Sequence, residues 1–169
     1  PRRARIGILE VAPWLVRCRT TERLHVSEVT HFVETQLPER PTRVMPGPPP
    51  EAMVVAGFVN EIVEDGDTIQ IGAGRTATFM PEGGAFEGKQ DLGWHSEITT
   101  ASMVQLMMDG TINSSRKTVD QDLAVTTLVA PGTPEAEEWV ANSGLIETRP
   151  VREVNSIRTI SAHERMCSI

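Results

Sequence analysis

Short apolar stretches typical of β-strands alternate along most of this chain with stretches in which apolar residues recur at helical spacing. The clearest helical stretch runs from Glu51 to Glu64, and the apolar strand pattern of Thr68 to Ile71 follows it closely. Strands that alternate with helices indicate a parallel sheet with helices packed on it. We therefore predict an α/β fold: an open, mainly parallel sheet with helices on both faces.

The other expected elements continue this alternation. Thr133-Pro134-Glu135 opens a helix with a hydroxyl cap and a proline in the first turn, and Gly110 ends another helix. Pro81 and Gly83-Gly84 are expected to break the helix that begins near Thr76. The full set comprises strands over 4–11, 24–34, 68–71, 92–95, 124–130, 145–151 and 158–162, and helices over 51–64, 76–86, 102–108 and 133–142.

A proline-rich stretch interrupts the pattern over residues 37–50. Proline lacks an amide donor, so this stretch fits neither a helix interior nor a central strand. We predict an extended linker there, between the end of an amino-terminal lobe (1–36) and a truncated α/β catalytic domain (51–169). The chain begins at Pro1, without a Met or a signal-peptide pattern, so we expect its natural start to be missing.

Composition argues against several classes of function. The 169 residues carry a net charge of -7 without a block of Lys or Arg, which argues against a nucleic-acid partner. No apolar run approaches the roughly 20 residues of a membrane helix, so we expect no membrane association. Cys18 and Cys167 lack a Cys-x-x-Cys partner. This favours two buried structural thiols in a reducing cytoplasm.

Glu97 is the strongest candidate for a catalytic group. It follows the apolar residues Leu92 and Trp94 at the expected exit of a strand, and its small neighbours Ser96 and Thr99 leave space for an acyl group. A partly desolvated carboxylate in such a place can attack an activated acyl group. The alternative interpretation is a solvated surface carboxylate.

A Gly-x-Gly turn, Gly72-Ala73-Gly74, follows the strand that ends near Gln70. Ligands of parallel sheets bind at the carboxyl ends of strands, so we expect Gln70 and this turn to lie beside Glu97. An amide of Ala73 or Gly74 could then donate to the oxyanion that the attack creates. The alternatives are a plain tight turn and a dinucleotide site, and the second lacks the acidic residue expected about 20 residues further on.

Further polar residues have weaker assignments. His95 and Ser96 adjoin Glu97 and are candidate substrate-binding residues. His-x-Glu is also half of the zinc-deaminase signature, but the Pro-Cys-x-x-Cys half is absent, so we predict no metal. Arg116 and Lys117 lie in a polar loop and are candidates for contact with a CoA phosphate. The alternative for that loop is a solvated turn.

Several segments match, in order, the motifs of one enzyme family. They are His25-Val26-Ser27 with Val33-Glu34, residues 65–74, residues 91–98, residues 109–113 with Ser115-Arg116-Lys117, and Arg149-Pro150-Val151 with Val154-Asn155. Together they resemble the acetyl-CoA hydrolase/transferase family, in particular its 4-hydroxybutyrate and butyryl CoA-transferase branch. The joint spacing covers nearly the whole chain and is more specific than any single motif.

The resemblance implies that Glu97 is the catalytic glutamate of a CoA-transferase. It would form an acyl-glutamyl anhydride from an acyl-CoA thioester and then a glutamyl-CoA thioester, from which an acceptor carboxylate takes over the CoA. Ala73 would supply one oxyanion donor. The implied substrates are an acyl-CoA and a small carboxylic acid, with no tightly bound cofactor, in a homodimer or with a complementing chain.

The chain also departs from the family pattern. Family members are much longer, and a later Gly-rich loop that supplies a second oxyanion donor is absent, so we expect an incomplete version of the fold. Three alternatives stay open. They are an acyl-CoA hydrolase, a non-catalytic subunit that needs a partner chain, and a sugar-phosphate isomerase-like protein in which Glu97 is a general base.

Overall fold

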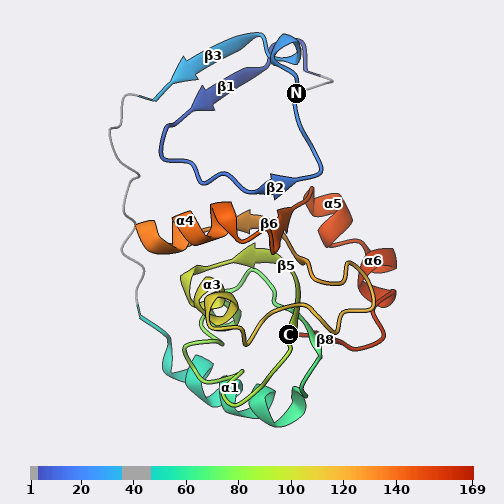
Figure 1. Cartoon of the computed structure of the whole chain (residues 1–169). Helices are drawn as coiled ribbons and strands as arrows, with labels where there is room; N and C mark the ends of the chain where they lie inside the picture. The colour runs from blue at the N-terminus through green and yellow to red at the C-terminus, as the bar shows by residue number, and fades with distance from the viewer. Residues whose placement is uncertain (1–3, 36–46) are drawn as a thin grey trace.

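A six-stranded, wholly parallel sheet forms the centre of the molecule. The computed structural model describes residues 4–35 and 47–169. The strand order is β2-β7-β6-β5-β4-β8, and every pair in it is parallel (Figure 1). The strands are β2 (Arg19–Thr20), β4 (Thr68–Gln70), β5 (Gly93–Thr99), β6 (Ala124–Val129), β7 (Ile146–Thr148) and β8 (Met166–Ser168). The predicted α/β class is confirmed.

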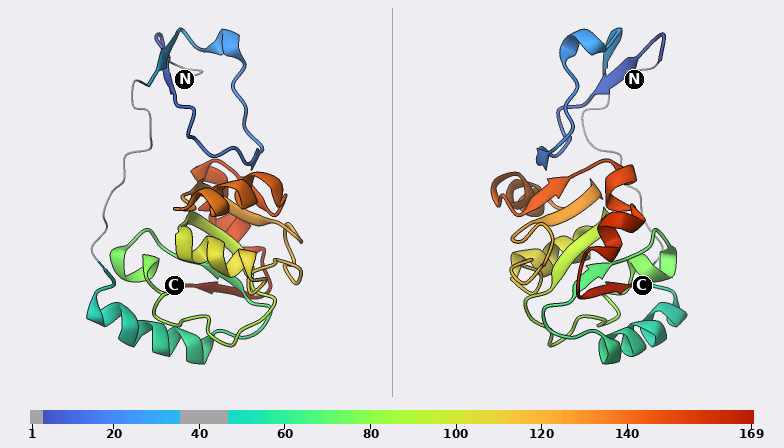
Figure 2. Two further views of the ribbon diagram at one scale, coloured as in Figure 1. Left: turned by 60° about the vertical axis from the view of Figure 1, so that its left-hand side comes forward. Right: turned by 90° about the vertical axis from the view of Figure 1, so that its right-hand side faces the viewer.

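Helices cover both faces of this sheet. They are α1 (Pro50–Ile62), α2 (Arg75–Thr78), α3 (Ala101–Met108), α4 (Pro134–Asn142), α5 (Val151–Val154) and α6 (Ile157–Ser161). The helices α3 and α4 pack together on one side, while α5 packs against β5 and β6 on the other (Figure 2). Within the described part of the chain, no helix is long and apolar enough to cross a membrane.

Large apolar side chains fill the space between sheet and helices. Four large side chains in this core are almost completely buried: Ile69 in β4, Phe86 in the loop after α2, Leu92 just before β5, and Trp94 in β5. Trp94 also satisfies its indole, since its Nε1 donates to Thr99 Oγ1 at 2.8 Å. The central strand β5 is therefore held by this internal bond as well as by its pairing with β4 and β6.

The amino-terminal residues form a separate ribbon. β1 (Ile8–Val11) pairs in parallel with β3 (His31–Glu34), and every residue of both strands is exposed. Between them the chain descends to the main sheet, where β2 pairs with β7. The predicted linker lies mostly outside the described residues, and Pro50 at its end already belongs to α1.

Two strand predictions were wrong in part or whole. Residues 158–162 lie largely in α6, where the Ile160 amide donates to the Ser156 carbonyl at 2.9 Å. The last strand is instead β8, which pairs with β4. Over 24–34 only β3 is a strand, because His25 and Glu28 cap a short 3-10 helix, Val26–Glu28, with reciprocal side-chain bonds.

The strand that carries Glu97 is longer than predicted. It runs from Gly93 to Thr99 because its second half pairs with β6, from His95 opposite Val125 to Thr99 opposite Val129. Glu97 therefore lies inside the strand rather than at its exit. The two cysteines, Cys18 and Cys167, are free and only partly buried.

Replacing Gly93 with Ala is expected to destabilise the fold. An added Cβ would lie 2.5 Å from Lys117 Cγ and 2.8 Å from Thr68 Oγ1, and overpacking of this kind costs about 1–3 kcal/mol. Gly57→Ala is the matched control, because nothing lies within 4 Å of a Cβ at that position in α1. It should stabilise by about 0.5–1 kcal/mol. Urea unfolding of both variants checks this, and equal midpoints would contradict it.

Candidate active site

The pairing of β4 with β5 determines which residues meet at the carboxyl end of the sheet. Thr68 lies opposite Gly93 and Ile69 opposite Trp94. The Ser96 hydroxyl extends this register, since its Oγ donates to the Ile71 carbonyl at 3.0 Å and accepts from the Ile71 amide at 3.3 Å. Continued one residue beyond Ile71 and Ser96, the same register would set Gly72 opposite Glu97.

Among the described residues, the Gly72-Ala73-Gly74 turn has one backbone donor without a backbone acceptor. The Gly72 amide donates to the Ile169 carbonyl at 3.0 Å, and the Gly74 amide donates to the Gly72 carbonyl at 2.9 Å. Ala73 is exposed, and its amide has no backbone acceptor in the described ranges. A donor held by two bonded neighbours and left unpaired itself can serve an oxyanion.

Glu97 is half-buried and held at both its backbone and its side chain. Its Oε2 accepts from Asn155 Nδ2 at 2.8 Å, and its carbonyl accepts from Thr126 Oγ1 at 3.3 Å. Asn155 directly follows α5. Sequence reasoning cited Asn155 only as part of the family resemblance. The signal for a role was its place in the Arg149-to-Asn155 segment, which overlaps the end of the predicted strand 145–151 and continues beyond it.

His95 and Ser96 are both completely buried inside the protein. His95 is completely buried, and its Nε2 bonds to the Val154 carbonyl at 2.8 Å. Its ring packs on His163 with centroids 5.1 Å apart. Burial lowers the pKa of His95, which favours the neutral ring. Both side chains hold the strand in place, and a direct contact with substrate stays a prediction.

Gln70 ends β4 and is half-buried, one residue before Ile71. Its carbonyl accepts from the Ile169 amide at 2.9 Å, next to the bond that Gly72 makes to the same residue. The predicted neighbours Gln70, Gly72 and Glu97 thus share one end of the sheet. Whether the Gln70 side chain contacts substrate stays a prediction.

Arg116 and Lys117 lie toward the opposite end of the strands. Lys117 is buried, and its Nζ donates to the carbonyls of Trp94 at 3.0 Å and Leu123 at 2.6 Å. Burial lowers the pKa of Lys117 to about 8. Arg116 is exposed and its guanidinium lies against Gly66, before β4 begins. The structure does not bring either cation to Glu97, and their contact with a phosphate stays a prediction.

An ion-pair cluster fixes the segment that leads to Asn155. Arg149 donates to both carboxylate oxygens of Asp120 at 2.9 Å and to Glu147 Oε1 at 2.8 Å. Burial alone would raise the pKa of Asp120, but the bonds from Arg149 leave it below its ordinary value. Paired guanidinium and carboxylate groups of this kind hold a defined geometry. Arg149 directly follows β7 and thus anchors the chain two residues before α5 begins.

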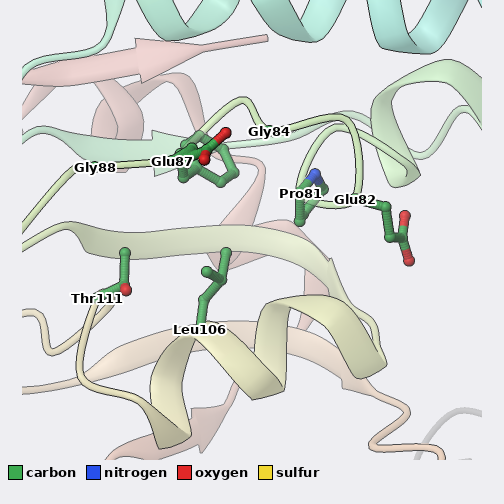
Figure 3. Close-up of a pocket in the computed structure, with 8 residues that line it drawn as sticks. Pro81, Glu82, Gly84, Glu87, Gly88, Leu106 and Thr111 are labelled. Atoms are coloured by element: carbon green, nitrogen blue, oxygen red, sulfur yellow. The ribbon is translucent and has the colours of Figure 1, made fainter.

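A separate pocket lies on the α3 side of the sheet. Figure 3 shows it between the loop that follows α2 and the helix α3. Its lining residues are Pro81, Glu82, Gly84, Phe86, Glu87, Gly88, Leu106 and Thr111. None of the predicted site residues lines it.

Comparison with known proteins points to one class of enzyme. No family model matches the chain. It is 32% identical over 168 residues to the succinyl-CoA:cyclohexane-1-carboxylate CoA transferase of Geobacter metallireducens, covering 99% of this chain and 38% of that protein. It is 29% identical over 172 residues to the 4-hydroxybutyrate coenzyme A transferase of Clostridium kluyveri, covering 98% and 38%. The resemblance to CoA-transferases is therefore confirmed.

The solved structures agree with the sequence relatives. The 4-hydroxybutyrate CoA-transferase from Porphyromonas gingivalis superposes with a TM-score of 0.80 at 29% identity, covering 96% of this chain and 41% of that one. The chain spans about 38% of the length of the curated relatives it matches. It has the fold of part of a CoA-transferase, incomplete relative to those proteins, as the sequence predicted.

The buried histidine pair should make the protein sensitive to acid. Burial, with the nearby charge of Lys117, lowers the pKa of His163 from 6.5 to about 4. The unfolded chain binds this proton at higher pH than the folded chain does, so stability falls as pH falls from about 6.5 to about 4. We expect His163→Gln to remove part of this loss. Urea unfolding at intervals between pH 7 and pH 4 measures it, and parallel curves for both proteins would contradict the assignment.

Proposed function

We propose that this chain carries the nucleophile of a CoA-transferase, with Glu97 as the catalytic residue. The observation that carries the proposal is a half-buried carboxylate on β5, held by Asn155, beside a strand β4 that leads into a turn whose Ala73 amide has no backbone acceptor among the described residues. The names of the relatives support CoA transfer as the reaction class. The substrates would be an acyl-CoA and a small carboxylic acid, with CoA thioester as substrate rather than bound cofactor.

The first step would be attack by a Glu97 carboxylate oxygen on the thioester carbonyl. The new C–O bond would form as the electron pair moves to the carbonyl oxygen, and the Ala73 amide would stabilise the charge on that oxygen. Collapse breaks the C–S bond and releases CoA thiolate, leaving an acyl-glutamyl anhydride. Asn155 holds the Glu97 Oε2 and so orients the other oxygen for attack.

The remaining steps return the glutamate. The thiolate attacks the glutamyl carbonyl, which releases the first carboxylic acid and forms a glutamyl-CoA thioester. An acceptor carboxylate then attacks this thioester and forms a second mixed anhydride with loss of thiolate. Attack of the thiolate on the acyl carbonyl gives the new acyl-CoA and frees Glu97. If water attacks an intermediate instead, the net reaction is hydrolysis, which is the alternative within the same chemistry.

Trapping the intermediate tests the proposal. The protein is incubated with an acyl-CoA and reduced with borohydride, and the modified peptide is mapped by mass spectrometry. We expect reduction of a thioester at Glu97 and none in Glu97→Gln, which keeps the shape but removes the nucleophile. The outcome that contradicts the proposal is an unmodified Glu97 both alone and with any complementing chain present.

Glu135→Gln is the matched control for this experiment. Glu135 is exposed in the first turn of α4 and makes the same change of charge away from the candidate site. The thioester at Glu97 should be trapped in Glu135→Gln at the same rate as in the unsubstituted protein. Product that survives Glu97→Gln without a trapped thioester would indicate hydrolysis by another route.

A second candidate, a subunit that works only with a partner chain, is favoured by exposed apolar surface. One face of α1 presents Val54, Phe58 and Ile62 to solvent, with 62%, 59% and 69% of each residue exposed. In the ribbon, Ile8 and Phe32 are also largely exposed. Parallel strands are ordinarily covered on both faces, and contiguous exposed apolar patches commonly mark contact surfaces.

We expect Phe58→Lys to weaken association without lowering stability. Phe58 is exposed, so its replacement should change the unfolding free energy by no more than about 0.5 kcal/mol. Concentration-dependent association, followed by sedimentation velocity, should decrease. Glu61→Lys, also exposed on α1, changes the charge without removing apolar surface and should associate as before. A large loss of stability in Phe58→Lys, or unchanged association, would count against a contact surface there.

A further inference from the structure

The hydrogen bond between Asn155 and Glu97 lies at the protein surface and needs support from the backbone beneath it. Asn155 is exposed, and Glu97 is half-buried. A solvent-accessible hydrogen bond between mobile side chains contributes little net free energy. Its geometry therefore depends on how firmly the backbone beneath Asn155 is fixed to the strand β5.

One buried contact fixes that backbone. The carbonyl of Val154, the residue before Asn155, accepts from His95 Nε2 at 2.8 Å, and both Val154 and His95 are completely buried. A carbonyl only accepts, so His95 carries its hydrogen on Nε2. His95 and Glu97 are two residues apart on β5 and so point to the same face of the sheet.

Within the part of the chain that the structure describes, the bond to the Val154 carbonyl is the only hydrogen bond of the His95 ring. Among the described residues its Nδ1 has no hydrogen-bond partner, and neither ring nitrogen of His163, which packs against it, has one. The other end of the α5 segment is held by the bonds of Arg149 to Asp120. The short helix α5 is thus clamped at its start by an ion pair and at its end by a histidine.

We propose that His95 is a positioning residue for Glu97, acting through the Val154 carbonyl and the Asn155 side chain. This inference rests on the proposed function, since positioning matters to the reaction only if Glu97 is the nucleophile. Loss of the clamp lets α5 move, which releases the Glu97 carboxylate from its attacking orientation. Misplacement by about 1 Å can lower a rate on the order of 100-fold.

A double-mutant cycle on the trapping rate tests the relay. His95→Phe keeps a buried ring but cannot donate, and it should lower the rate of Glu97 labelling on the order of 10-fold to 100-fold. His95→Gln keeps a donor and should recover most of that rate. In the Asn155→Ala background, His95→Phe should have almost no further effect, because both changes break the same connection. Additive losses in the double variant would overturn the proposal.

A second measurement separates this inference from the proposed function. In ¹⁵N-labelled protein the side-chain amide signal of Asn155 should shift in Glu97→Gln and also in His95→Phe, but not in His25→Phe at an exposed site. All spectra are recorded below the unfolding temperature of each variant. If no glutamyl intermediate forms but these shifts appear, the proposed function fails and the clamp stands. An Asn155 signal unchanged by His95→Phe overturns the clamp.

Discussion

The hydroxyl of Ser96 ties together the two strands on which the candidate site depends. It both donates to and accepts from the backbone of Ile71, across the pair β4 and β5. A one-residue slip of this register would turn Glu97 to the other face of the sheet. The bond therefore fixes how β5, which carries Glu97, is aligned with β4, which leads into the Gly72-to-Gly74 turn. Ser96, which the sequence predicts as a substrate-binding residue, sets the alignment of the strands, and its contact with substrate stays a prediction.

Much of the fold was predictable because its elements carry local signals. The Thr133 hydroxyl caps α4 as expected, accepting from the Ala136 amide at 3.2 Å, and the strand over Thr68 to Gln70 lies one residue from its predicted end. The errors arose where local pattern and tertiary pairing disagree. Residues 158–162 include the β-branched Thr159 and Ile160 but lie largely in the helix α6, whereas Met166 to Ser168 form a strand because they pair with β4.

The candidate site likewise has one part that the sequence predicts and another part that it does not. That Glu97 and the Gly72 turn share an end of the sheet follows from parallel topology, which sequence periodicity predicts. The bond from Asn155 to Glu97 joins residues 58 positions apart in the sequence, and a local sequence pattern does not reveal a contact over that separation. The burial of His95 was equally hidden, because a histidine beside a candidate nucleophile looks the same in sequence whether it faces a ligand or a helix.

The buried ammonium of Lys117 has a practical consequence for studies with reactive thioesters. Because its pKa is about 8, a substantial fraction of this amine is unprotonated in mildly alkaline buffer. Neutral amines react spontaneously with acyl donors, yet the bonds to Trp94 and Leu123 keep this one enclosed. Non-enzymatic acylation of Lys117 would thus report transient local unfolding of the loop at the amino end of β5. The same mass spectra that map the Glu97 label would detect it.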